Sequence, residues 1–164
     1  MPQEIERKFL VANDSWRANA TGELYCQGYI ATTAPGHSVR VRIAGDRAYL
    51  TIKGPTQGLS RAEFEYEIPV VDAQEMLHTL CDRPLIEKMR YRLPIGPIVW
   101  EIDEFKGENA GLIIAEVELD TEEQSFERPG WLGQEVSGET QYYNASLVSN
   151  PYSKWSQNIG KAVG

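Results

Sequence analysis

The chain is poor in cysteine and histidine, and this limits the chemistry it can carry. Its 164 residues include two cysteines and two histidines. Cys26 and Cys81 each lie in an apolar pattern, so we expect reduced core thiols and no disulfide framework. His37 and His78 are far apart in the sequence, which disfavours a zinc site or a histidine-based catalytic site.

Long apolar runs and excess positive charge are also missing. No stretch approaches the ~18 apolar residues of a membrane span, and residues 1–8 lack the apolar core of a signal peptide. We therefore expect a cytoplasmic protein with no membrane partner. The 16 basic residues are outnumbered by 24 acidic ones, for a net charge of −8. A nucleic-acid partner is not expected, because such binding needs a basic surface.

What the sequence has in abundance is period-two alternation of apolar and polar residues, which is typical of β-strands with two unlike faces. Eight runs alternate in this way, at residues 4–9, 24–30, 39–43, 48–53, 62–68, 88–93, 100–103 and 113–119. Their polar faces hold seven basic residues, namely Lys8, Arg40, Arg42, Lys53, Lys88, Arg90 and Arg92. They also hold nine acidic residues, namely Glu4, Glu6, Glu63, Glu65, Glu67, Glu101, Asp103, Glu116 and Glu118.

This pattern predicts a mostly β (α+β) fold. A strand face exposed to water would normally carry Ser, Thr, Asn and Gln as well, and these polar faces carry few of them. Eight strands can close into a barrel, which would place the charged faces inside. We therefore expect an eight-stranded antiparallel, tunnel-like β-barrel with a charged lumen and a few external helices. One helix is expected from a cap at Asp72 to Cys81, a shorter one after Asp120 or Thr121, and another at about 140–148. The length suits a single domain over residues 1–164.

A lumen with clustered cations and clustered carboxylates favours a phosphate-rich ligand. Arginine forks match phosphate oxygens, and lysine supplies point charges. The carboxylates cannot contact phosphate directly, but they are suitable ligands for Mg²⁺ or Mn²⁺. The pairs Glu4/Glu6 and Glu116/Glu118 are the best candidates for such ligands.

The order of these motifs resembles the CYTH superfamily, the triphosphate tunnel metalloenzymes. The resemblance begins at Glu4-Ile5-Glu6-Arg7-Lys8 and covers about residues 3–148, which leaves 149–164 as a tail. It continues through Gln27-Gly28-Tyr29, Arg40-Val41-Arg42, Thr51-Ile52-Lys53-Gly54, Glu63-Phe64-Glu65-Tyr66-Glu67, Lys88-Met89-Arg90-Tyr91, Trp100-Glu101-Ile102-Asp103-Glu104-Phe105 and Ala115-Glu116-Val117-Glu118-Leu119.

The resemblance implies roles for individual residues. The substrate triphosphate would be held by Lys8, Arg40, Arg42, Lys53, Lys88 and Arg90. One or two ions of Mg²⁺ or Mn²⁺ would be bound by Glu4, Glu6, Glu116 and Glu118, with Asp103 and Glu65 as helpers. Lys8 and Tyr29 would act catalytically by positioning or deprotonating the attacking water; otherwise Tyr29 is an ordinary aromatic residue lining the barrel. Arg92 and Glu67 are placed near the tunnel mouth.

The function that follows is metal-dependent hydrolysis of inorganic tripolyphosphate. Three alternatives stay open. Two are enzymes of the same resemblance, a class IV adenylate cyclase that converts ATP to cyclic AMP and pyrophosphate, and a thiamine triphosphatase. The third is a non-catalytic polyphosphate-binding module, which the set of carboxylates disfavours because anion binding alone does not need them. The partner is a small-molecule triphosphate, and the protein itself is expected to be a monomer or a homodimer.

Overall fold

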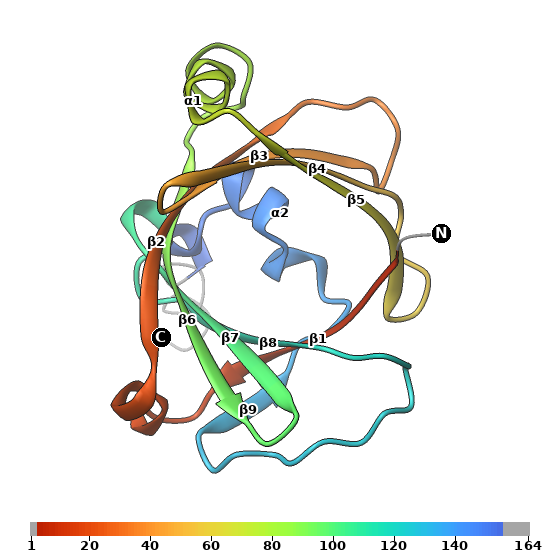
Figure 1. The fold of residues 1–164 in the computed structure, drawn as a ribbon, viewed down its shortest axis with the longest axis vertical. Helices are drawn as coiled ribbons and strands as arrows, with labels where there is room; N and C mark the ends of the chain where they lie inside the picture. The colour runs from red at the N-terminus through yellow and green to blue at the C-terminus, as the bar shows by residue number, and fades with distance from the viewer. Residues whose placement is uncertain (1–2, 156–164) are drawn as a thin grey trace.

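The eight alternating runs form strands that close into a ring, as the computed structural model shows for residues 3–155 (Figure 1). In chain order the strands are β1 (Gln3–Val11), β2 (Thr21–Ile30), β3 (Ser38–Ala44), β4 (Arg47–Lys53), β5 (Ser60–Ile68), β6 (Ile86–Ile95), β7 (Ile98–Phe105) and β8 (Ile113–Glu118). They follow the order β5-β4-β3-β2-β6-β7-β8-β1, and β1 also pairs with β5. The expected eight-stranded antiparallel barrel is confirmed.

Strand β1 closes the barrel because successive parts of it pair with different neighbours. Gln3–Ile5 pair with β5, and Glu6–Leu10 pair with β8. The end of β1 pairs with an additional strand, β9 (Leu132–Glu135), outside the ring. Strand β9 was not predicted from the sequence, because four residues are too few to show a period. A side chain at Gly133 would lie 2.9 Å from the carbonyl oxygen of Leu10, so this pairing needs glycine.

The apolar faces of the strands point outward, and their cover completes the core. Trp100, fully buried on β7, makes edge-to-face contacts with Phe9, Phe126 and Trp131 at centroid distances of 5.4–5.8 Å. Phe126 and Trp131 belong to the segment after β8, for which a helix was expected. That helix is absent from the described structure: residues 119–131 form irregular turns, because their aromatic side chains are held against the barrel wall.

Helix α1 (Val70–Thr79) covers another part of the wall. It begins after Pro69, so the expected cap at Asp72 is wrong, and Asp72 lies in its first turn. Ala73 and Leu77 are buried against β3 and β4. The position of α1 outside the ring is clear in Figure 1. No helix of residues 3–155 is long and apolar enough to cross a membrane.

The segment after β9 returns to the barrel. The helix expected at about 140–148 is divided into a 3₁₀ helix (Thr140–Tyr142) and helix α2 (Asn144–Ser149), because the backbone at Tyr143 is extended. In Figure 1, α2 is seen within the outline of the ring. Of the tail expected from residue 149, the part up to Trp155 packs back onto the protein, and residues 156–164 lie outside the described structure.

We expect substitution of Glu135 by glutamine to destabilise the protein modestly. Arg7 donates two hydrogen bonds to the Glu135 carboxylate, at 2.8 and 2.6 Å, which ties β1 to β9. The bond from Arg7 lowers the pKa of Glu135. The stabilisation, about 0.5–1 kcal/mol for a partly exposed pair, is therefore present above the unfolded-state pKa of ~4.3 and lost as the pH falls through the folded-state value.

Urea unfolding of wild type and Glu135→Gln at pH 7 and at pH ~3.5 measures this difference. The gap in unfolding free energy should shrink at the lower pH. Glu127→Gln, at an exposed position on the neighbouring loop, is the control and should show no gap at either pH. A gap that stays constant between the two pH values would contradict the assignment.

Candidate functional site

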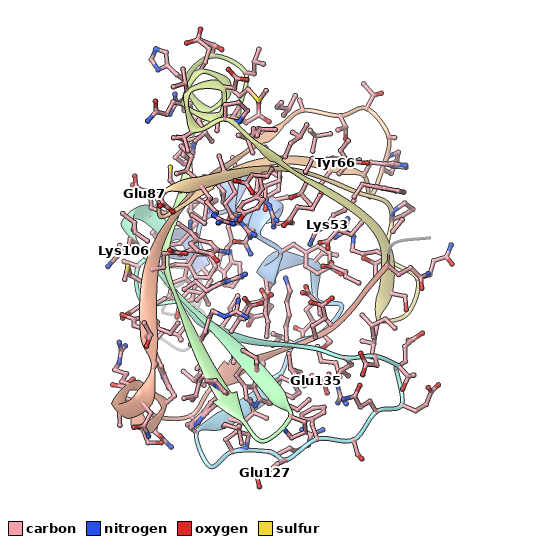
Figure 2. The ribbon with its side chains drawn as sticks, in the orientation of Figure 1. Lys53, Tyr66, Glu87, Lys106, Glu127 and Glu135 are labelled. Carbon is pink, nitrogen blue, oxygen red and sulfur yellow. The ribbon has the colours of Figure 1, made fainter. Side chains whose placement is uncertain are left out.

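The interior of the ring is a cavity of about 1250 Å³. Figure 2 shows Lys53 pointing into the ring, whereas Glu127 lies outside it. Of the site residues predicted from the sequence, the cavity lining includes Glu4, Glu6, Lys8, Tyr29, Arg40, Arg42, Lys53, Glu65, Lys88, Arg90, Glu116 and Glu118. Asp103 lies behind this lining and is fully buried. The charged lumen follows from strand parity, because residues two apart on one strand share a face.

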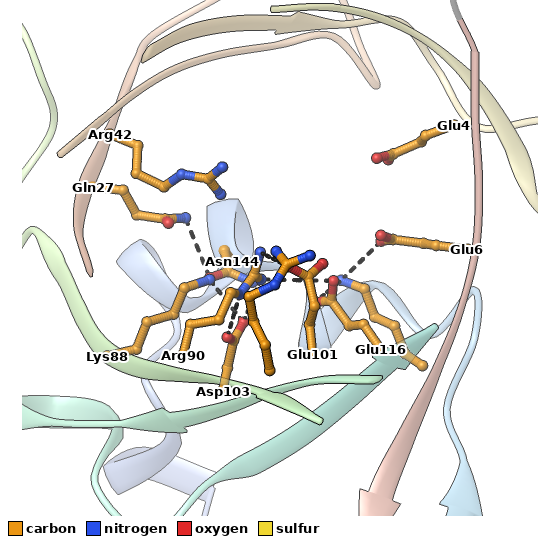
Figure 3. Close-up of polar contacts among 12 residues, drawn as sticks. Glu4, Glu6, Gln27, Arg42, Lys88, Arg90, Glu101, Asp103, Glu116 and Asn144 are labelled. Atoms are coloured by element: carbon orange, nitrogen blue, oxygen red, sulfur yellow. Dashed lines mark hydrogen bonds and ion pairs between the residues drawn. The ribbon is translucent and has the colours of Figure 1, made fainter. Parts of the chain in front are cut away.

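One wall of the cavity is a buried group of cations arranged around Asp103. Arg90 donates two hydrogen bonds to the Asp103 carboxylate, at 2.7 and 2.8 Å, and Lys88 Nζ lies 2.8 Å from Asp103 Oδ2 (Figure 3). Burial opposes the charge on Asp103, but Arg90 and Lys88 outweigh this and lower its pKa. Burial lowers the pKa of Lys88 to about 7, against the attraction of Asp103. Both carboxylate oxygens of Asp103 are therefore taken up by cations.

Arg40 and Arg42 extend this wall across β3. Arg40 contacts Thr51 at 3.1 Å and Glu65 at 3.4 Å, and Arg42 lies 4.0 Å from Glu65. Burial, then repulsion by Arg40 and Arg90, lowers the pKa of Arg42 to about 10. The buried Nε atoms of both arginines have no hydrogen-bond partner among residues 3–155. These cations repel one another and have hydrogen-bond donors without partners, so a polyanionic ligand would fit between them.

The opposite side of the cavity carries the carboxylates and two lysines. Lys53 Nζ lies 2.9 Å from Glu4, and Lys8 Nζ lies 3.8 Å from Glu6 and 3.9 Å from Glu116. Burial and the charge of Glu116 raise the pKa of Glu6 to about 8. Burial, followed by repulsion from Glu4, also raises the pKa of Glu118. The lysines therefore neutralise only part of the negative charge of this group.

This donor set fits a hard divalent cation. Carboxylate oxygens are the ligands that Mg²⁺ and Mn²⁺ prefer, and a bound cation would relieve the repulsion between Glu6, Glu116 and Glu118. No three acidic, histidine or cysteine side chains of residues 3–155 are placed to hold an ion by themselves. A complete protein cage is not required, because Mg²⁺ is usually held by one or two carboxylates, with water and substrate phosphates as the other ligands.

Two of the predicted charged residues lie away from the centre. Arg92 has 62% of its side chain exposed and pairs with Glu101 at 3.0 Å. Glu67 has 57% of its side chain exposed, is absent from the cavity lining, and lies 3.8 Å from Arg47. Arg92 still lines the cavity, whereas Glu67 does not.

The segment that leads into α2 contributes to the site in a way that the sequence did not predict. Asn144 Oδ1 accepts a hydrogen bond of 2.8 Å from Lys88 Nζ. The ring of Tyr143 lies 4.8 Å from Lys8 Nζ, within the range of a cation–π contact. Ser137 Oγ accepts a hydrogen bond from the backbone of Lys8. No local signal marks these residues as functional, because a helix expected over 140–148 does not by itself indicate that its residues reach the cavity, which happens only through the tertiary fold.

Comparison with known proteins gives consistent matches over nearly the whole chain. The CYTH domain model matches residues 2–152. The chain is 50% identical to an inorganic triphosphatase of Acetivibrio thermocellus over 157 residues, which is 96% of this chain and 100% of that protein. It is 38% identical to an inorganic triphosphatase of Nitrosomonas europaea, over 88% of this chain and 96% of that protein. The solved structure of the inorganic triphosphatase NE1496 matches with a TM-score of 0.63 and 33% identity, covering 88% and 96% of the two chains.

Proposed function

The chain belongs to the CYTH domain family, and from this membership we propose that it is an inorganic triphosphatase, a hydrolase that releases orthophosphate from tripolyphosphate. The observation that carries this is 50% identity to such an enzyme over nearly the full length of both chains. The lumen supports it, because its cations have unused donors and its carboxylates suit a divalent metal. A non-catalytic polyphosphate-binding module would have no use for those carboxylates.

In this proposal the two sides of the cavity bind different parts of the substrate. Arg40, Arg42 and Arg90 would hold phosphate oxygens with their guanidinium groups, and Lys88, Lys53 and Lys8 would add point charges. Fixed positive charge of this kind stabilises the transferring and leaving oxygens, and such stabilisation is most of the catalysis in phosphoryl transfer.

The metal ligands in the proposal are Glu4, Glu6, Glu116 and Glu118, and the ion is Mg²⁺ or Mn²⁺, in one or two copies. When bound, the ion would supply Lewis-acid polarisation and neutralise charge on the triphosphate. Glu65 contacts Arg40 and would help by orienting it. For Asp103 we propose that it positions Lys88 and Arg90, because both of its oxygens already accept from them.

Lys8 and Tyr29 are proposed to handle the attacking water. Burial opposes the charge on Lys8, but Glu116 and Glu6 outweigh it, so the pKa of Lys8 is raised and its ammonium remains charged. Tyr29 is close enough to contribute to the same shift. The charged ammonium of Lys8 and the neutral hydroxyl of Tyr29 would position this water by hydrogen bonds, and neither group would take its proton.

A product analysis tests the function. The protein is incubated with tripolyphosphate, ATP or thiamine triphosphate in the presence of Mg²⁺ or Mn²⁺, and the products are resolved by ion chromatography. We expect orthophosphate and pyrophosphate, formed fastest from tripolyphosphate. Cyclic AMP and pyrophosphate from ATP would establish a cyclase, and preferred turnover of thiamine triphosphate would establish a thiamine triphosphatase. Tight binding of all three without turnover would refute any catalytic role.

A further inference from the structure

Gln27 is a buried polar residue that the proposed mechanism does not use. It lies on β2 opposite Arg42, with none of its surface exposed. Its Nε2 donates to the Tyr29 hydroxyl at 3.0 Å. The same nitrogen donates to Asn144 Oδ1 at 3.3 Å (Figure 3). Its Oε1 has no hydrogen-bond partner among residues 3–155. The amide therefore makes both of its contacts through one nitrogen, at the cost of an unsatisfied buried oxygen.

The neighbouring ammonium group fixes the direction of these hydrogen bonds. In the ammonium form, which the Asp103 carboxylate 2.8 Å away favours, Lys88 Nζ has only protons to give, so the Asn144 atom that it contacts at 2.8 Å is the acceptor Oδ1. The Gln27 atom facing the same Oδ1 therefore has to be the donor Nε2. Because Nε2 also faces Tyr29, the phenol oxygen of Tyr29 is an acceptor in that contact. The chain of contacts thus orients both amides, although either amide alone could be drawn in two ways.

The acceptor role of the Tyr29 oxygen decides where its proton points. A phenol proton lies in the ring plane and has two preferred positions, one on each side of the oxygen. With the Gln27 N–H on one side, the proton of Tyr29 is directed to the other. Tyr29 lines the cavity and is close enough to Lys8 to affect its charge. The hydroxyl is therefore held ready to interact with what occupies the cavity.

We propose that Gln27 is a positioning residue, which orients the Tyr29 hydroxyl toward the reacting water and is itself oriented by Lys88 through Asn144. The proposal rests on the triphosphatase function argued above. It gives Asn144, at the start of α2, a part in the reaction. Asn144 accepts hydrogen bonds from both Lys88 and Gln27, and it thereby links the orientation of the Gln27 amide to a substrate-binding lysine. Gln27 touches neither substrate nor metal in this scheme and acts only through Tyr29.

The test is a double-mutant cycle with Gln27→Met and Tyr29→Phe, measured as kcat and KM for tripolyphosphate at saturating Mg²⁺. Methionine keeps the size of glutamine and removes both the donor and the unsatisfied oxygen, so the unfolding midpoint should change little. We expect kcat to fall about tenfold, as for the loss of one hydrogen bond at a reacting group, with KM within about threefold. In the Tyr29→Phe background, the same substitution should have no further effect on kcat.

Two further variants complete the design. Gln27→Glu leaves only acceptors facing Tyr29, which reverses the hydrogen bond, and should lower kcat at least as much as Gln27→Met. Gln74→Met, on the exposed face of α1, is the matched control and should behave as wild type. A wild-type kcat in Gln27→Met, or an equal loss in both backgrounds of the cycle, would overturn the proposal. Failure of the wild-type protein to hydrolyse tripolyphosphate would instead refute the function on which it rests.

Discussion

Glutamine in place of Glu116 should lower kcat for tripolyphosphate at least ~100-fold and raise the Mg²⁺ concentration needed for half-maximal rate. Glu116 lies where the two sides of the cavity meet, 3.9 Å from Lys8 and 3.8 Å from Arg90. Burial acts to raise its pKa, but Lys8 and Arg90 outweigh this and lower it, so it is ionised at neutral pH. Glutamine keeps the shape and one oxygen but removes the charge that would attract a cation.

Steady-state rates across a Mg²⁺ titration, with and without EDTA, measure this effect. Wild-type activity should be lost in EDTA and return with added Mg²⁺ or Mn²⁺, whereas Glu116→Gln should recover only in part. Glu75→Gln, at an exposed position on α1, is the control for loss of a carboxylate elsewhere. If Glu116→Gln keeps the wild-type rate and the wild-type Mg²⁺ dependence, Glu116 is not a metal ligand.

The lining of the cavity was predictable because a strand has only two faces. Once Glu4 and Glu6 are assigned to one face of β1, Lys8 must join them, and the same rule applies to Arg40 and Arg42 on β3. Eight such strands can close into a ring with the charged faces inside, and a helix and loops then cover the apolar faces on the outside. The charged interior is therefore a direct consequence of parity and strand number.

Other features were not predictable, because they depend on contacts between segments distant in sequence. Asn144 reaches Lys88 from 56 residues away, and the helix expected around it gives no indication of this contact. Strand β9 exists because Gly133 allows the backbone to approach β1 closely. Parity placed Asp103 on the inner side of β7 correctly, but it could not show that Arg90 and Lys88 would occupy both of its oxygens. Which cation a carboxylate contacts depends on the strand register, and alternation does not encode the register.

The Asp103 contacts lead to the largest stability change that we expect. Asparagine at this position keeps the volume but leaves Lys88 and Arg90 without their shared counter-charge in a fully buried setting. Removing one partner of a buried ion pair typically costs 3–5 kcal/mol, so Asp103→Asn should lower the free energy of unfolding by about that much. Since Lys88 and Arg90 line the cavity and would lack the charge of Asp103, tripolyphosphate should restore more stability to the variant than it adds to wild type.

Urea unfolding with and without tripolyphosphate, in EDTA so that no turnover occurs, separates this account from simple core damage. A packing defect would leave the two proteins with equal gains from the ligand, whereas unpaired cations predict a larger gain for Asp103→Asn. Glu104→Gln is the matched control: it lies next to Asp103 on β7, but its carboxylate pairs with Arg17 at the surface. Its cost should stay below ~1 kcal/mol. A similarly small cost for Asp103→Asn would mean that Lys88 and Arg90 do not depend on Asp103 for their charge.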